Sequence, residues 1–189
     1  MQPAPELCGP WFSGISGGAW WVQDYEVSIP FLGFPGDTFE FETGFGVNLT
    51  PIGYRLSDTF SLSLEVGYHE AETDALANPL FGSVPMDGQL RLAPAVINAN
   101  FNFPITDGLS IYLTVGAGVA YRELEASFPL GGFFVHDSGW NAIAQARTGV
   151  MFEVGECSFV NVGYRYQHVF STPDDIQGHM VEAGYTWTG

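Results

Sequence analysis

The fold is decided by the stretch Gly108-Leu-Ser-Ile-Tyr-Leu-Thr-Val-Gly-Ala-Gly-Val-Ala-Tyr121, in which apolar side chains alternate with small or polar ones. Successive side chains of a β-strand point to opposite faces, so a period of two indicates a strand with one apolar face. The same alternation occurs in runs that begin at Phe39 and at Phe60. The chain is therefore predicted to be built from β-strands.

Weaker alternation extends this pattern over the rest of the chain. Eight strands are predicted in all, at residues 11–22, 39–50, 60–68, 90–103, 109–121, 140–152, 159–168 and 179–187. We expect the alternation to slip by one residue near Pro51 and near Pro94, because a β-bulge tolerates the missing N–H of proline.

The connections between these strands alternate in length. Long connections are at 23–38, 70–89, 123–139 and 169–178, and short ones are at 57–59, 105–108 and 154–156. The short ones carry turn residues such as Asp107-Gly108. An even number of antiparallel strands connected in this way is typical of outer-membrane barrels, whose short turns face the periplasm and whose long loops face outside.

Composition narrows the class of protein further. The 189 residues include 21 acidic and five basic side chains, for a formal charge of −16, so we expect no nucleic-acid partner. All five basic residues are arginines, whereas an ordinary soluble surface also uses lysine. The longest charge-free stretches, 92–106 and 108–121, are too short for a transmembrane helix. The length fits one domain, with 1–10 as a periplasmic N-terminal segment and 11–189 as the barrel.

The alternation fits two classes of barrel, which differ in the face that meets the surroundings. A soluble lipocalin-like barrel would turn its apolar face inward. Here the polar face is rich in glycine and carries arginine without lysine, which suits a confined interior with paired charges. With strands running alternately up and down, large aromatic residues gather at both strand ends, where membrane interfaces favour them. One belt comprises Trp11, Tyr54, Phe60, Phe101, Phe103, Phe152, Phe159 and Trp187, and the other Trp20, Trp21, Phe39, Tyr68, Tyr121, Trp140 and Tyr166.

We therefore predict an all-β fold, an eight-stranded antiparallel up-and-down transmembrane β-barrel with short periplasmic turns and long extracellular loops. The expected location is the bacterial outer membrane, where a monomer contacts outer-membrane lipid and lipopolysaccharide. The first five residues have neither a basic start nor an apolar run, so we expect that a signal peptide has been removed.

Three stretches resemble strands of a known family. Residues 108–121, the phrase Val162-Gly-Tyr-Arg-Tyr166 and the closing Val181-Glu-Ala-Gly-Tyr-Thr-Trp187 are similar to strands of opacity-type outer-membrane β-barrels, a superfamily that includes the membrane domain of outer-membrane protein A. The resemblance covers nearly the whole chain and implies the same barrel fold, but it implies no activity. The last strand of that family usually ends on a terminal aromatic residue, whereas Thr188 and Gly189 follow Trp187 here.

The alternation points six charged side chains into the barrel: Glu42, Glu65, Arg122, Arg147, Arg165 and Glu182. Buried charges need partners, and we expect Arg165 and Glu182, on adjacent strands, to pair. The interior of an eight-stranded barrel is just wide enough for side chains to fill it. A plugged polar interior is therefore predicted, and not a conducting pore.

The two cysteines map to the periplasmic end of the barrel. Cys8 precedes the first strand, and Cys157 lies in the short turn before the seventh. The periplasm is oxidising and the chain has no Cys-x-x-Cys pattern, so a disulfide between them is predicted.

Four histidines map to extracellular strand ends or loops: His69, His136, His168 and His179, near Glu70, Glu72, Asp137, Asp174 and Asp175. Imidazole and carboxylate are ordinary ligands of divalent cations, so a cation site is one interpretation. No two histidines have a close ligand spacing, and solvated loop residues are the simpler interpretation. No metal ion and no cofactor are predicted.

One segment suggests an enzyme. Residues 164–173, with the following His179-Met-Val-Glu182, are similar to the final hairpin of lipid A deacylases, which are outer-membrane barrels that use His, Ser and Glu on their lipid-facing surface. The resemblance carries over to His168, but the serine position of that family is Phe170 here, and Ser171 lies one position late on the other face. The alternation points Glu182 inward. Because a nucleophile and its base must lie within hydrogen-bond reach, lipid A esterase activity is kept as an alternative only.

Three long loops are unusually apolar, at 28–36, 75–86 and 127–135. An exposed apolar patch usually marks a surface for a partner, a lipid or a small molecule, although such loops also pack on one another as a cap. The candidates for this surface are Phe31, Phe34, Phe128, Phe133 and Phe134. The predicted function is structural or adhesive, through apolar and acidic loops that meet a host, surface or protein partner. A carrier of small hydrophobic molecules bound at the loops is a further alternative.

Overall fold

The computed structural model describes residues 8–23, 25–27, 37–78, 82–127, 134–171 and 175–189. These residues form ten strands: β1 (Trp11–Val22), β2 (Tyr25–Val27), β3 (Asp37–Phe41), β4 (Gly44–Arg55), β5 (Phe60–Asn78), β6 (Gly82–Thr106), β7 (Leu109–Ser127), β8 (Phe134–Gly155), β9 (Ser158–Phe170) and β10 (Ile176–Thr188). Within these ranges no helix is long and apolar enough to cross a membrane.

Eight of the strands close into a ring. Each strand from β4 to β10 pairs antiparallel with the next, and β1 pairs with both β4 and β10. The short strands β2 and β3 pair with each other, and β3 also pairs with β5, so they extend the first hairpin beyond β1 and β4. The prediction of an eight-stranded antiparallel barrel is confirmed.

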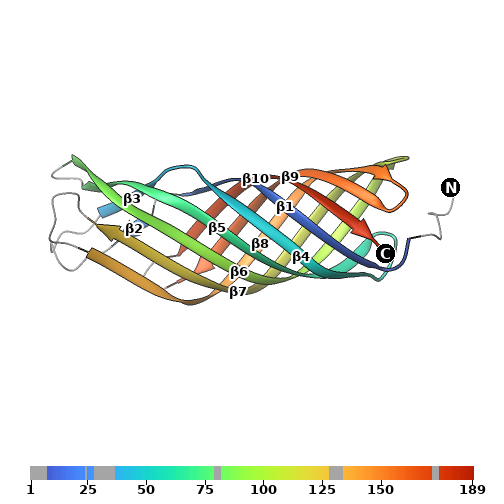
Figure 1. Cartoon of the computed structure of the whole chain (residues 1–189), viewed down its shortest axis with the longest axis horizontal. Helices are drawn as coiled ribbons and strands as arrows, with labels where there is room; N and C mark the ends of the chain where they lie inside the picture. The colour runs from blue at the N-terminus through green and yellow to red at the C-terminus, as the bar shows by residue number, and fades with distance from the viewer. Residues whose placement is uncertain (1–7, 24, 28–36, 79–81, 128–133, 172–174) are drawn as a thin grey trace.

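Both the beginning of β1 and the end of β10 lie at one end of the barrel (Figure 1), where Phe12 pairs with Thr188. The three short turns also lie there, at residues 56–59, 107–108 and 156–157. Gly108 has a φ of +82°, which a side chain would disfavour, and so permits the two-residue turn between β6 and β7. This is the end that the sequence assigned to the periplasm.

The strands are longer on one side of the barrel. β6 has 25 residues and β8 has 22, whereas β9 and β10 have 13 each. At ~3.3 Å per residue and a tilt of ~40°, β6 rises ~60 Å, more than twice the ~25 Å apolar band of an outer membrane. The long loops expected at 70–89 and 123–139 are therefore mostly strand, and the sheet continues well above the membrane.

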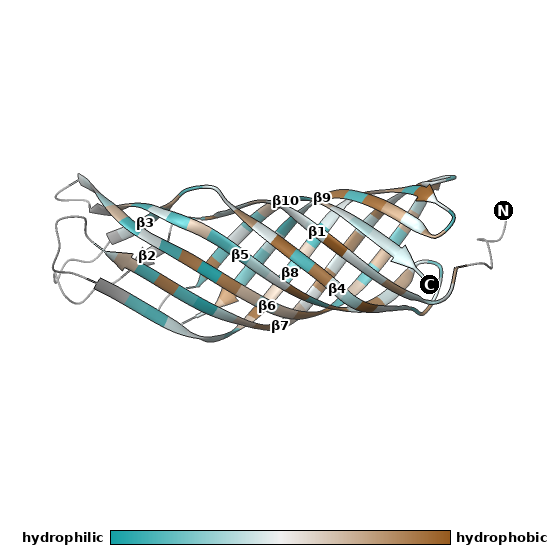
Figure 2. Cartoon of the chain, viewed as in Figure 1, coloured by the Kyte–Doolittle hydropathy of each residue, from teal (hydrophilic) through white to brown (hydrophobic). Residues whose placement is uncertain are grey.

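The chemistry of the outer face changes along the strands. On β5, Leu64, Val66 and Tyr68 are exposed in the part nearer the short turns, which we call the lower part. Farther from the turns, in the upper part, the same face carries Glu70 and Glu72. Figure 2 shows the alternation of hydrophobic and hydrophilic residues along the central strands. Because side chains at i and i+2 share a face, the face that meets lipid below Tyr68 meets water above it.

The inner face changes in the opposite sense. In the lower half it carries Ser63, Glu65 and Asn98, all buried. In the upper half it carries apolar side chains, among them Leu90 and Leu92, each 2% exposed. The expectation of an entirely polar interior is therefore wrong for the extracellular half, where the sheet turns its apolar residues inward as any water-soluble β-structure does.

Several single positions also differ from the expectation. Register shifts between Leu49 and Ile52, as predicted around Pro51, but pairing on either side of Pro94 keeps the same register. Trp20 is fully buried and does not join the outer aromatic belt. Phe159 lines the interior at the periplasmic end. The alternation alone does not show which of two neighbouring aromatic residues faces lipid.

Candidate functional site: the barrel interior and its extracellular rim

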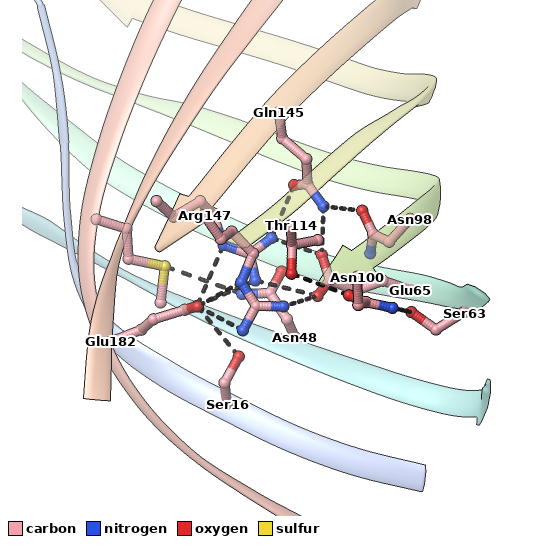
Figure 3. Close-up of polar contacts among 12 residues, drawn as sticks. Ser16, Asn48, Ser63, Glu65, Asn98, Asn100, Thr114, Gln145, Arg147 and Glu182 are labelled. Atoms are coloured by element: carbon pink, nitrogen blue, oxygen red, sulfur yellow. Dashed lines mark hydrogen bonds and ion pairs between the residues drawn. The ribbon is translucent and has the colours of Figure 1, made fainter. Parts of the chain in front are cut away.

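Four charged side chains meet in the middle of the barrel: Glu65 of β5, Arg147 of β8, Arg165 of β9 and Glu182 of β10. Figure 3 labels Glu65, Arg147 and Glu182 of this group. We call them the ion quartet. Nη1 and Nη2 of Arg165 lie 2.5 Å from Oε1 of Glu65 and 3.0 Å from Oε2 of Glu182. Arg147 bridges the same two carboxylates, with Nη1 3.0 Å from Oε2 of Glu65 and Nη2 2.6 Å from Oε1 of Glu182.

The ion quartet connects opposite walls of the barrel. β5 and β9 lie four strands apart in the ring, so the Arg165 side chain crosses the interior to reach Glu65. The Arg165 side chain is fully buried, and only 2% of the Glu65 side chain is exposed. A buried charge costs several kcal/mol unless it is paired and hydrogen-bonded. Two guanidinium groups on two carboxylates leave the cluster formally neutral, which satisfies that requirement.

Neutral polar side chains complete the ion quartet. Gln145 donates Nε2 to Oε1 of Glu65 at 2.9 Å and to Oδ1 of Asn98 at 2.8 Å, and its Oε1 accepts from Arg165 at 2.8 Å. The Ser16 hydroxyl donates to Oε2 of Glu182 at 3.1 Å. These contacts hold Glu65, Arg165 and Glu182 in place and satisfy lone pairs that the arginines leave free.

Below the ion quartet lies a cavity of about 740 Å³ that reaches the periplasmic turns. Its wall includes Arg147 at the inner end and the turn residues Asp58 and Asp107 at the mouth. Hydroxyl and amide side chains such as Thr114 and Asn161 line the rest together with apolar ones such as Phe12 and Phe159. The interior below the ion quartet is therefore hollow and not filled by side chains.

Above the ion quartet the interior is apolar. Trp20 and Met180 are fully buried there, next to Leu90 and Leu92, in one cluster of buried side chains. The Trp20 ring lies 5.4 Å from the ring of His69, whose Nε2 is 2.9 Å from Oδ1 of Asn48. His69 was expected at an extracellular strand end, but it is fully buried inside the barrel at the boundary between the polar and apolar halves.

Of the charges expected in the interior, Glu42 lies elsewhere and Arg122 lies inside but apart from the ion quartet. Glu42 is exposed and lies in the break between β3 and β4, where its backbone N–H donates to the carbonyl of Glu72. The alternation of β4 does not continue through this break, which is why counting residues failed. Arg122 does face inward, but it pairs with Asp137 near the top of β8, far from the ion quartet.

The predicted disulfide is confirmed. Cys8 and Cys157 are bonded and join the segment before β1 to the turn between β8 and β9. The other predicted surface lies largely outside the described residues: this holds for Phe31, Phe34, Phe128 and Phe133. Phe134 begins β8. Of the apolar loop expected at 75–86, Ala75, Leu76 and Met86 are buried on β5 and β6.

The structure does not bring the three esterase candidates together. Glu182 holds both arginines of the ion quartet, whereas His168 lies on the outer face with Nε2 3.0 Å from Oδ2 of Asp175. Ser171 uses its backbone N–H to bind Oδ1 of Asp175. Glu182 and His168 thus lie on opposite faces of the sheet, and Glu182 cannot orient His168 for catalysis.

Sequence reasoning missed the chemistry of the outer face above the aromatic belt. Arg91 on β6 lies between two carboxylates, with Nε 3.3 Å from Oε2 of Glu70 and Nη1 3.3 Å from Oε2 of Glu123. The outward-facing acidic residues of this region, which we call the acidic rim, are Glu70, Glu72, Asp74, Asp87, Glu123 and Glu125. Their spacing of two residues was visible in the sequence, but it was assigned to loops.

These features agree with the pattern of one protein family. The description of that family is "outer membrane protein beta-barrel domain", and its pattern matches residues 13–188. The chain belongs to this family. It is therefore an outer-membrane β-barrel protein of a bacterium, as the resemblance implied, and the ends with short turns and with tall strands are its periplasmic and extracellular ends.

Solved outer-membrane barrels share the fold at low sequence identity. Neisserial surface protein A is 18% identical with a TM-score of 0.61, over 97% of this chain and all of its own. OprG of Pseudomonas aeruginosa is 14% identical with a TM-score of 0.58, over 96% and 98% of the two chains. Ail, the attachment invasion locus protein of Yersinia pestis, is 15% identical with a TM-score of 0.52, over 94% and 99%, in a complex with the heparin analogue sucrose octasulfate. No curated protein matches the sequence. The likeness extends to the fold alone.

Proposed function

We propose that this outer-membrane barrel is a non-enzymatic structural and adhesive protein, closed to solutes, that carries a tall acidic sheet above the membrane. The observation that carries the proposal is the combination of the ion quartet with the apolar layer above it. Arg165 bridges Glu65 and Glu182 across the interior, and fully buried Trp20 and Met180 follow toward the outside. Ions would have to cross a paired polar barrier and then an apolar one.

The adhesive part of the proposal rests on the sheet above the membrane. β5, β6, β7 and β8 continue far beyond Tyr68 and Tyr121, which mark the upper membrane interface. Membrane spanning requires only ~9–11 residues per strand, so the additional length has another use. A rigid paired sheet holds its outer residues at fixed positions, which favours binding of a partner over binding by mobile loops.

Conductance in planar bilayers tests the closed interior. We expect no stable openings for the purified wild-type protein. Reproducible openings on the nanosiemens scale would contradict the closed interior. Arg165→Met/Glu65→Met keeps the remaining Arg147 and Glu182 as a pair, and we expect this variant to stay closed as well, because the apolar layer is unchanged.

Attachment of cells that display the protein tests the adhesive role. One variant shortens the β5–β6 and β7–β8 hairpins to the level of the aromatic belt, and a second changes Phe34, Phe128 and Phe134 to Ser. Both should migrate as folded barrels on unboiled gels, because the membrane strands are intact. Loss of attachment in either variant supports adhesion, and wild-type attachment in both would contradict it.

A second candidate, a carrier of small hydrophobic molecules, is favoured by one observation. Residues 134–141 of β8 pair with β7, whereas pairing with β9 begins only at Ala142 and Phe170. Among the described residues, β7 is the strand whose backbone pairs with 134–141, and β9 does not reach this part of β8. The β9–β10 hairpin is thus shorter than its neighbour β8 beside the apolar upper interior, which is where a small hydrophobic molecule would enter from the side.

Tryptophan quenching tests this candidate. A variant that keeps only Trp20, with the other four tryptophans changed to Phe, reports on the apolar interior. A short bromoalkane should quench Trp20 at concentrations that leave a Trp140-only variant, which reports on the outer surface, unaffected. Equal quenching of both variants would show partition into detergent and would exclude a binding site.

A further inference from the structure

The acidic rim contains one group of side chains whose chemistry differs from the rest. Glu123 and Glu125 lie on β7, and His136 lies on β8, directly across from Glu125 in the register. Oxygen and nitrogen atoms of the three side chains lie within 4.8 Å of one another. Nδ1 of His136 is 3.5 Å from Oε1 of Glu125. An imidazole thus faces the same point as two carboxylates.

The β-sheet explains this convergence. Residues 123 and 125 share the outer face of β7 because side chains alternate, and the cross-strand partner of 125 projects from the same face. The pair Tyr121 and Trp140 lies next along the same two strands, with ring centroids 5.5 Å apart. The group is therefore held on a rigid ladder just above the membrane interface.

Neighbouring side chains orient the two carboxylates. Nη1 of Arg91 lies 3.3 Å from Oε2 of Glu123, and Nε2 of Gln89 donates to Oε2 of Glu125 at 3.4 Å. Arg91 and Gln89 thus contact Oε2 of each glutamate and leave Oε1 available to a ligand. Hydrogen bonds of this kind orient ligand side chains in metal sites.

We propose that Glu123, Glu125 and His136 bind one divalent transition-metal ion of the zinc class on the extracellular surface. One imidazole nitrogen with two carboxylate oxygens is a ligand set that suits Zn²⁺. Mg²⁺ and Ca²⁺ prefer all-oxygen sites with more ligands, so the imidazole favours a transition metal over them. Three protein ligands leave a coordination position open to water or to an external group.

Titration calorimetry with Zn²⁺ alone, on the folded protein in detergent at neutral pH, tests the proposal. We expect one ion per chain in the wild type. His136→Ala and the pair Glu123→Gln/Glu125→Gln should each weaken binding by at least tenfold. His179→Ala and Glu72→Gln are matched controls, a histidine and a glutamate on the same outer surface but outside the group, and they should bind as the wild type does.

Three results would overturn the proposal. Absence of Zn²⁺ binding in the wild type would leave a His136–Glu125 ion pair only. Binding that survives the triple variant Glu123→Gln/Glu125→Gln/His136→Ala would place the ion elsewhere. Mg²⁺ or Ca²⁺ bound as tightly as Zn²⁺, with no effect of His136→Ala, would reduce the group to a diffuse acidic surface. Unboiled gel mobility of each variant establishes that the barrel is folded.

Discussion

Arg165 and Glu65 face each other from opposite walls of the barrel, with Nη1 of Arg165 2.5 Å from Oε1 of Glu65. The pair fixes the distance between β9 and β5, strands that share no backbone hydrogen bonds. It therefore braces the barrel across its width.

Replacing Arg165 by Met should lower the free energy of unfolding by about 3–5 kcal/mol, because Glu65 and Glu182 then share a single arginine in a buried site. Urea unfolding in lipid vesicles, followed by gel mobility, measures the change. In Arg165→Met/Glu65→Met the remaining pair is neutral, and we expect a smaller loss than for Arg165→Met alone. Additive losses in the double variant would contradict a coupled ion quartet.

Gly18 should resist substitution at the seam between β1 and β10. A Cβ at Gly18 would overlap the carbonyl oxygen of Val181, a backbone atom that cannot move without breaking the ladder. We expect Gly18→Ala to lower stability by about 1–3 kcal/mol, as overpacking does. In Gly17→Ala the nearest atom is the Gly46 carbonyl oxygen at 3.3 Å, so that neighbouring variant should lose less stability than Gly18→Ala.

Leu92 and Leu64 provide a test of the two environments. Leu92 is 2% exposed inside the barrel, and Leu64 is 39% exposed on the outer face. Leu92→Ala should cost about 2–5 kcal/mol, because neighbouring side chains cannot fill the space. Leu64→Ala should cost less, because mobile lipid chains fill the gap. Equal losses in vesicle unfolding would contradict an apolar layer packed within the barrel.

Much of this architecture could be predicted from alternation alone. Because side chains alternate along β5, the sequence places Leu64 and Val66 on the outer face and Glu65 on the inner face. The same alternation on β9 and β10 places Arg165 and Glu182 inside. The alternation failed at Glu42 because the chain leaves the sheet between β3 and β4. It could not choose between Trp20 and Trp21, since either of two adjacent aromatic residues satisfies an interface belt.

The extracellular half was misread for a different reason. Glu70 and Glu72 lie on the same outer face of β5 as Leu64 and Val66. The change from apolar to acidic side chains on this face had indicated the end of the strand. The strand continues, and only its surroundings change from lipid to water. The contact between Glu125 and His136 could not be found by local spacing, because it depends on the register of two strands joined by a loop.

Reduction of the disulfide should lower the temperature at which the barrel unfolds without changing its native fold. The bond closes a long segment, since Cys8 and Cys157 are 149 residues apart, and cross-links of this kind typically contribute about 2–4 kcal/mol. Heat-dependent gel mobility with and without reductant measures the effect. Cys8→Ser/Cys157→Ser serves as the control, because reductant should not alter its behaviour.

The same bond has a consequence for biogenesis. Once Cys8 and Cys157 are joined, β1 to β8 belong to a covalent ring, and only β9 and β10 remain on a free tail. The barrel closes when β10 meets β1, whose start is then already tethered beside the turn that leads into β9. A chain that is oxidised before it enters the membrane therefore holds the start of β1 beside the turn into β9, and the last hairpin has only a short distance to cover to complete the wall.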